Sequence, residues 1–265
     1  MRFDRIVAIL WQELFVTLHS TEVIVDIVFY PLVNVVVFGF LSLYLSGGSG
    51  NTTPAGHYVL LGMVLWQIIW IVQYSITLGS LWNVWSRNLS NMFIAPLRIS
   101  EYLFAQGLSG VIKAILIVAI GGVMANVLFD FDLLEIGFLP LLLSFVSFVI
   151  FAFATGVAVL GMIFRFGTRI QALAWGLIAI FQPLSAAFYP VAVLPTGLRY
   201  IAYIFPPTLT FEAARWGMTH GHAVAWDLFG ISFAENAIYF LLCAWVFLRL
   251  YRKSRDTGQF ARNEA

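Results

Sequence analysis

Hydrophobic and polar positions divide the chain into long apolar segments separated by polar connections. Six segments have this character: Val23–Leu45, Tyr58–Leu81, Leu103–Leu128, Phe138–Ile163, Ile170–Phe188 and Leu228–Leu250. A helix needs about 20 apolar residues to cross a bilayer, and each segment approaches or exceeds that length. The pattern predicts an all-α membrane protein with six transmembrane helices, forming one transmembrane domain over residues 23–250.

Residues 1–22 follow a different pattern, in which polar and apolar side chains alternate at helical spacing. One predicted face is polar, with Arg2, Arg5, Gln12 and His19, and the opposite face is apolar, with Phe3, Ile6, Leu10, Leu14 and Leu18. Such a helix lies in the membrane surface with its basic side chains toward the lipid headgroups. We therefore expect an interfacial amphipathic helix, the alternative being a plain leader to the first span.

The stretch Phe181–Arg215 is apolar but is interrupted by five prolines, namely Pro183, Pro190, Pro195, Pro206 and Pro207. Proline removes a backbone donor and restricts the residue before it, so each proline marks a break in a helix. Freed backbone groups persist at membrane depth only inside protein or beside a wet cavity. We expect the fifth span to end early and short re-entrant helices to fold back into the outer leaflet over residues 189–218. Glu212 and Arg215 should pair on one of them, with Thr208 or Thr210 as its cap. The alternative is that Arg199 and Arg215 attract anionic headgroups or an anionic substrate.

Basic residues set the orientation, because cytoplasmic connections carry an excess of Lys and Arg. They fall in alternate connections: Arg2 and Arg5, Arg87 and Arg98, Arg165 and Arg169, then Arg249, Arg252, Lys253, Arg255 and Arg262. The opposite connections, residues 46–57 and 129–137, contain neither Lys nor Arg. Both termini are therefore predicted to be cytoplasmic, with residues 251–265 as a cytoplasmic tail, and the proline-rich segment faces outward.

The cytoplasmic connection over residues 82–102 is about four times longer than a tight turn needs. It mixes apolar Phe93, Ile94 and Leu97 with polar Arg87 and Asn88. Exposed apolar groups framed by polar ones usually mark a docking site. We expect a partner protein to dock there, unless the second and third spans simply extend beyond the bilayer.

Together these stretches make the chain resemble the permease subunits of ABC type-2 transporters. The resemblance is carried by the surface helix, the six spans, the Arg87-Asn88-Leu89…Phe93…Ala95-Pro96-Leu97-Arg98 segment, and Leu194-Pro195…Leu198-Arg199…Pro206-Pro207-Thr208…Glu212-Ala213…Arg215. It departs from the family at Asn88-Leu89-Ser90-Asn91, where many relatives have Gly-Thr-x-Glu.

The resemblance implies a homodimer that binds two separate cytoplasmic ABC ATPases, which would bind ATP and Mg. It implies no cofactor and no catalytic or metal site in this chain, and the permease is not expected to be an enzyme. Residues implied to couple to the ATPase are Arg87, Asn88, Asn91, Phe93, Pro96, Leu97, Arg98 and Glu101. The implied outer gate comprises Pro183, Pro190, Pro195, Arg199, Pro206, Pro207, Glu212 and Arg215. A phosphate-cradling loop needs Gly-Lys-Ser/Thr, whereas the two lysines here, Lys113 and Lys253, follow Ile and Arg.

Polar and charged residues within the spans are candidates for a substrate pathway, because they are costly in a bilayer. The candidates are Asp26, Tyr30, Asn34, Gln67, Tyr74, Lys113 and Gln182. For Lys113 we favour a structural role over substrate contact. Aromatic residues at the span ends, among them Trp66 and Trp70, are interpreted as an interfacial belt rather than a carbohydrate platform.

Composition excludes a soluble domain, since 61% of the residues are hydrophobic and 10% are charged, against about 25% charged in ordinary globular chains. Nothing in the charge pattern indicates a nucleic-acid partner. We predict a permease subunit of an ATP-driven exporter in a bacterial or archaeal inner membrane, in contact with membrane lipid. Its amphipathic substrate would be a glycolipid, polysaccharide or hydrophobic drug. The alternatives are an ion-coupled secondary transporter, which would need broken helices in both halves, and a membrane enzyme that modifies lipid.

Overall fold

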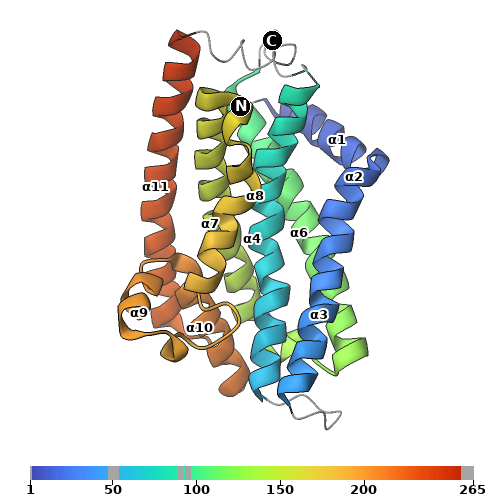
Figure 1. The fold of residues 1–265 in the computed structure, drawn as a ribbon, viewed down its shortest axis with the longest axis vertical. Helices are drawn as coiled ribbons and strands as arrows, with labels where there is room; N and C mark the ends of the chain where they lie inside the picture. Colours follow the sequence, from blue (N-terminus) through green and yellow to red (C-terminus); the bar gives the residue numbers. More distant parts are fainter. Residues whose placement is uncertain (1, 47–53, 87, 89–91, 93–96, 258–265) are drawn as a thin grey trace.

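The computed structural model describes residues 2–46, 54–86, 88, 92 and 97–257. These residues form helices and the connections between them (Figure 1). The α-helices are α1 (Phe3–His19), α2 (Thr21–Ile24), α3 (Tyr30–Leu45), α4 (Pro54–Trp85), α6 (Ile99–Phe129), α7 (Phe138–Phe166), α8 (Ala172–Leu184), α9 (Thr196–Ala202), α10 (Pro206–Thr219) and α11 (Trp226–Asp256). Shorter helical turns are η1 (Val25–Phe29), η2 (Leu133–Ile136), η3 (Gly167–Ile170) and η4 (Val191–Val193).

Five helices in this part of the chain are long and apolar enough to cross a membrane. They are the continuous stretch Thr21–Leu45, which joins α2, η1 and α3, and then α4, α6, α7 and α11. The predicted fifth span, Ile170–Phe188, forms the 13-residue helix α8. At about 1.5 Å per residue α8 is roughly 20 Å long, shorter than a hydrocarbon core of about 30 Å. A sixth complete span therefore stays a prediction.

Helix α4 is the axis of the bundle. In the most apolar 18-residue stretch of α4, 94% of the residues are buried, compared with 17% in the corresponding stretch of α11. The reason is that α3, α6, α7 and α8 all pack against α4. Glycines allow two of these contacts: a Cβ on Gly110 would lie 3.0 Å from the Cα of Val72, and one on Gly156 would lie 3.2 Å from the Cβ of Ile76. Small residues bring membrane helices close in this way. Polar side chains on α4 are consequently enclosed by protein.

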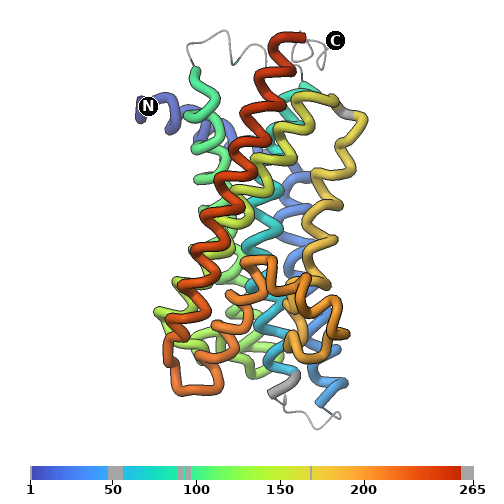
Figure 2. The backbone as a smooth tube through the Cα atoms, turned by 90° about the vertical axis from the view of Figure 1, so that its left-hand side faces the viewer, coloured from blue at the N-terminus to red at the C-terminus, as the bar shows by residue number. Residues whose placement is uncertain are grey.

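The two ends of the bundle differ. The start of α1 and the end of α11 lie at the same end, and α9 and α10 lie at the other (Figures 1 and 2). Helix α11 runs beside α7 along most of its length (Figure 2). This arrangement agrees with a chain whose connections alternate between two sides. Which side is cytoplasmic stays a prediction from the basic residues.

The predicted amphipathic helix at the N-terminus is α1, which lies across one end of the bundle (Figure 1). Its buried side chains are Ile6, Ile9 and Glu13, and α6 is its principal neighbour. Large apolar side chains cover the exposed face, namely Phe3, Trp11, Phe15 and Leu18. The sequence pattern placed Phe3 and Ile6 together on one apolar face, whereas the structure buries Ile6 against the bundle and leaves Phe3 exposed.

Prolines break the segment after α8 as expected. Pro183 lies in the last turn of α8, Pro190 precedes η4, and Pro195 precedes α9. Pro206 and Pro207 occupy the first turn of α10, where a missing N–H costs nothing because no carbonyl is available to it. Helix α10 packs between α7 and α11, so the chain folds back along the bundle after its break.

Candidate functional site

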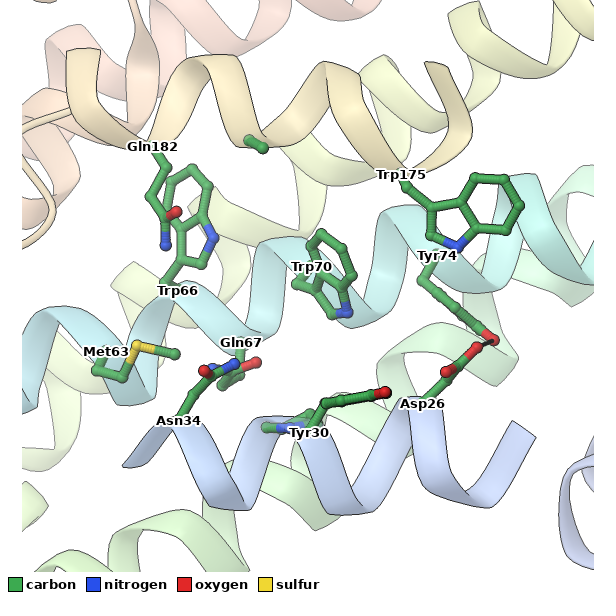
Figure 3. A pocket seen from close by; sticks show the side chains of 12 residues that line it. Asp26, Tyr30, Asn34, Met63, Trp66, Gln67, Trp70, Tyr74, Trp175 and Gln182 are labelled. Atoms are coloured by element: carbon green, nitrogen blue, oxygen red, sulfur yellow. Dashed lines mark hydrogen bonds between the residues drawn. The ribbon is translucent and has the colours of Figure 1, made fainter. Parts of the chain in front are cut away.

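Six of the seven pathway candidates line one cavity of about 310 Å³, between the Thr21–Leu45 helix, α4 and α8 (Figure 3). The exception is Lys113, which lies at a different cavity. The lining residues are Asp26, Tyr30, Pro31, Asn34, Met63, Trp66, Gln67, Trp70, Tyr74, Trp175, Ala179 and Gln182. Because α4 is central, residues from three distant parts of the sequence meet at its surface.

An irregular helical turn forms one wall of this α4 cavity. Residues Val25–Phe29 form the π-helix η1, in which the amide of Tyr30 donates to the carbonyl of Val25, five residues earlier. Pro31 follows directly and cannot donate to the preceding turn. Wide turns of this kind are frequent at functional sites. Here the turn carries Asp26, whose carboxylate accepts a hydrogen bond of 2.7 Å from the Tyr74 hydroxyl.

Gln67 is the most enclosed polar residue of the α4 cavity, with 3% of its surface exposed. No hydrogen-bond partner for its Nε2 is found among the residues that the structure describes. A buried donor without a partner costs about 1–3 kcal/mol. Asn34 and Gln182 lie at the same end of the cavity (Figure 3). The three amides thus form a polar group that is available to a bound molecule.

Aromatic rings supply most of the remaining wall. Trp66 and Trp70 come from α4 and Trp175 comes from α8. The interpretation of Trp66 and Trp70 as an interfacial belt is wrong, because Trp66 is 3% exposed and both line the cavity. Trp66 and Trp70 are four residues apart, so both rings lie on the same face of α4, and this face is the one that lines the cavity. Sequence reasoning did not identify Trp175 or Met63 at all.

A second cavity, of about 460 Å³, lies where α1, α4 and α6 meet. Glu13 and Lys113 both line it and are 5% and 6% exposed. Within the described residues Lys113 makes neither a hydrogen bond nor an ion pair within 4.0 Å, although it attracts Glu13 electrostatically. The Asn83 amide donates to the Glu13 carboxylate at 3.3 Å. Burial raises the pKa of Glu13, and the opposing effects of Lys113, Gln106 and Asn83 are smaller.

Glu101, one of the residues expected to couple to an ATPase, holds α1 in place. It is 1% exposed and accepts hydrogen bonds from the backbone amides of Arg2 at 2.8 Å and Arg98 at 3.1 Å. The guanidinium of Arg5 lies 3.5 Å from the same carboxylate. Glu101 therefore joins the start of α6 to the start of α1, a role that its sequence position did not indicate.

The rest of the predicted coupling segment is described only in part. Arg87, Asn91, Phe93 and Pro96 lie outside the described residues. The Asn88 side chain donates to Asn83 at 3.4 Å, and Arg98 is the N-cap residue of α6. Leu97 is partly buried against the core, so the docking surface gains less from this side chain than its sequence suggested.

At the opposite end, Arg215 joins α10 to the break after α8. Its guanidinium donates to the carbonyls of Ala186 at 2.6 Å and Ala187 at 2.7 Å. Ala186 has a φ of 51°, a left-handed conformation that turns its carbonyl away from the helix. Arg215 is 6% exposed, which argues against attraction of lipid headgroups by this side chain, while the same alternative for Arg199 stays a prediction.

Two further predictions at this end are wrong. Among the described residues, Glu212 and Arg215 attract each other but form no ion pair within 4.0 Å; Glu212 accepts from the Tyr203 hydroxyl at 3.3 Å. Phe205 is the N-cap of α10, with no side-chain cap bond. Thr208 donates to the carbonyl of Ala202 at 2.6 Å. Thr210 instead joins a buried cluster on α7 and α11, with Ser147 and Ser232 both in contact with its hydroxyl at 2.7 Å.

The other predicted gate residues differ in their burial. Arg199 lies on α9 and donates to the carbonyl of Ala192 at 2.7 Å. Pro183, Pro190 and Pro195 are exposed, whereas Pro206 and Pro207 are buried within α10. The structure thus brings the predicted gate residues to one end of the bundle, around α9 and α10, without showing movement there.

Comparison with known proteins gives one family. The family model described as ABC-2 type transporter matches residues 4–219. The match begins in α1 and ends at the last residue of α10, and so contains both cavities and the Arg215 contact. No curated protein matches the sequence.

Proposed function

The chain belongs to the ABC-2 type transporter family and is a multi-pass membrane permease component, and from this premise we propose that it is the substrate-conducting subunit of an ATP-driven exporter. Two copies would assemble in a bacterial or archaeal inner membrane with two cytoplasmic ABC ATPases. ATP and Mg would bind to those partners. The substrate would be an amphipathic molecule taken from the cytoplasm or the inner leaflet.

One observation carries this proposal: polar residues that are scattered along the sequence converge on the α4 cavity. Asp26, Asn34, Gln67 and Gln182 come from three helices, and aromatic rings separate the acid from the amides (Figure 3). Polar side chains inside spans are costly unless they serve packing or function. Gln67 has an amide nitrogen without a partner in the described chain, which packing alone does not explain.

The end of the bundle at which α1 lies, which we predict to be cytoplasmic, would supply a route for coupling to the ATPase. The connection between α4 and α6 is the expected docking surface, and Glu101 ties the end of that connection to α1. Movement of the connection would therefore move α1 and α6 together. Helix α4 begins the same connection and also lines the α4 cavity, so a push on its inner end would reach the proposed substrate site.

The assembly is tested by purification and reconstitution. We expect the tagged permease to retain an ABC ATPase in equal amounts when the two are produced together. In vesicles, the complex should export at least one member of a panel of neutral, cationic and anionic fluorescent amphiphiles, and only with ATP. Flux driven by a proton gradient through the permease alone would instead support a secondary transporter. Conversion of added lipid without transport would support an enzyme.

A matched pair of variants tests the cavity. Gln182→Leu removes an amide that lines it, and Gln171→Leu removes one next to α8 that does not. We expect the first variant to reduce export about fivefold or more while ATPase retention is unchanged, since the loss of one hydrogen bond of about 1 kcal/mol has that size. The second variant should transport normally. Equal transport by both variants would remove the α4 cavity from the pathway.

A further inference from the structure

The α4 cavity has two chemically different ends. Asp26 and Tyr74 lie at one end, and the amides of Asn34, Gln67 and Gln182 lie at the other (Figure 3). Trp70 lies between them. A molecule that fills the cavity would therefore meet a carboxylate at one end and neutral hydrogen-bonding groups at the other.

The charge of the cavity has one sign. Asp26 contributes a carboxylate, and no lysine, arginine or histidine is among the described residues that line the cavity. The hydroxyl of Tyr74 solvates one carboxylate oxygen at 2.7 Å but carries no compensating charge. An anionic ligand would be repelled at this end, whereas a neutral sugar would gain hydrogen bonds but no charge attraction. A cation would gain both.

The aromatic rings of the cavity also favour a positively charged ligand. Five aromatic side chains contribute to the wall, namely Tyr30, Trp66, Trp70, Tyr74 and Trp175. A cation over such a ring gains about 0.5–2 kcal/mol, most over tryptophan. Aromatic walls beside a lone carboxylate are the usual means of recognising alkylated ammonium groups. The same rings provide apolar contact for the body of an amphiphile.

We propose that the α4 cavity binds amphiphilic organic cations, with the positive charge at Asp26 and the aromatic or alkyl body against Trp66 and Trp70. A neutral polar group on the ligand would pair with the free amide nitrogen of Gln67. As a statement about what the transporter exports, this inference rests on the proposed function. As a statement about binding, it needs only the permease.

Binding is tested on the full chain in lipid nanodiscs without an ATPase, by titration calorimetry. The probes are benzyltriethylammonium, the anion phenylmethanesulfonate, which carries a similar ring, and the neutral glycan cellobiose. We expect saturable binding of the cation only. Asp26→Asn should weaken it about five- to tenfold, the loss expected for one partly buried charge contact. The control Glu22→Gln removes the same charge from an exposed residue one turn earlier and should leave binding unchanged.

The comparison of the three probes on the unaltered protein needs no variant, so a misfolded Asp26→Asn protein does not remove the test. Equal binding of the anion, or binding of cellobiose in place of the cation, overturns the inference. So does cation binding that is insensitive to Asp26→Asn. Selective cation binding without ATP-dependent export would instead leave the inference standing and refute the proposed function.

Discussion

Helices α1 and α10 are not among the five long helices, and they attach to the bundle in opposite ways. Helix α1 buries three of its 17 residues, Ile6, Ile9 and Glu13, and its polar contacts are concentrated around two carboxylates, Glu13 and Glu101. Helix α10 buries ten of its 14 residues. It is held by neutral hydroxyls around Thr210 and by a guanidinium, Arg215, that donates to backbone carbonyls.

This contrast indicates which end of the molecule is built to move. A helix held by a few polar contacts can be released by changing one of them, whereas a helix buried on most sides moves only with its neighbours. We infer that α1 is the mobile attachment and that α10 is part of the fixed frame. At the outer end, movement of the proposed gate should then be in α9, where Leu198 and Tyr200 are exposed.

Arg215→Met should break the α10 attachment with the largest effect. Methionine keeps the apolar stem but leaves the carbonyls of Ala186 and Ala187 buried without their donor. Two charge-assisted bonds are lost, and we expect the free energy of unfolding to fall by about 3–5 kcal/mol. Thermal unfolding of the purified protein, followed by light scattering and fluorescence, measures this loss.

Arg199→Met is the matched control for that substitution. It removes the same charge from α9, where the side chain is only half-buried and also donates to backbone carbonyls. Ala192 is exposed, whereas Ala186 and Ala187 are buried. Water can therefore reach the Ala192 carbonyl when the guanidinium is removed, and a smaller loss of about 1 kcal/mol is expected. If the two variants were equally stable, Arg215 would not hold α10 to the break after α8, and the comparison of the two attachments would fail at its outer end.

Glu101→Ala should release α1 with an intermediate effect. The substitution removes the acceptor for the amides of Arg2 and Arg98 and the partner of Arg5. A local loss of about 1.5–3 kcal/mol corresponds to roughly a tenfold to hundredfold increase in the open population. Cleavage by trypsin at Arg2 and Arg5 should accelerate by that factor, measured by mass spectrometry of the N-terminal fragments.

Asp4→Ala provides the control for Glu101→Ala, because Asp4 is an exposed acid in the first turn of α1. Its loss should leave the cleavage rate within about twofold of the original, since an exposed first-turn acid contributes well under 1 kcal/mol. Unchanged cleavage in Glu101→Ala as well would mean that packing of Ile6 and Ile9 against α6 is sufficient to hold α1.

Much of the fold could be predicted because it follows from local patterns. Apolar length gave the five long helices, and prolines gave the breaks after α8, since both signals lie within one continuous stretch of the chain. The α8 length was harder: apolar residues continue beyond Leu184, and only the left-handed turn at Ala186 shows that the helix has ended. Composition does not distinguish an apolar helix from an apolar turn that is buried in the protein.

The polar contacts were predictable as candidates but not as pairs. Six pathway residues met at the α4 cavity because polar groups inside spans avoid lipid, and this rule needs no knowledge of the packing. The Arg2 amide that Glu101 accepts from on α1 lies 99 residues away, and the carbonyls bound by Arg215 lie 28–29 residues away, so spacing along one helix could not reveal these contacts. The expected pair Glu212–Arg215 was also not predictable from local spacing, because the guanidinium donates to carbonyls that are freed by a break distant in the sequence.

A pH experiment on Glu13 tests the α1 attachment with the smallest expected effect. Burial raises the pKa of Glu13 above its usual 4.5, and Lys113, Gln106 and Asn83 are the groups that oppose this. The folded protein then holds this proton to higher pH than the unfolded chain does. Stability therefore decreases as pH rises from 4.5 through the raised pKa. Glu13→Gln removes this decrease, so its stability relative to the original protein should increase over the same range.

The measurement is the difference in unfolding midpoint between the two proteins from pH 4 to pH 8, because a difference cancels the titration of all other groups. Glu22→Gln, which alters an exposed acid in α2, should show no such trend. A difference of the opposite sign would mean that attraction to Lys113 outweighs burial, so that ionised Glu13 stabilises the attachment. In that case α1 would be fixed by a buried charge pair as firmly as α10 is fixed by Arg215, and the two ends of the molecule would no longer differ in their freedom to move.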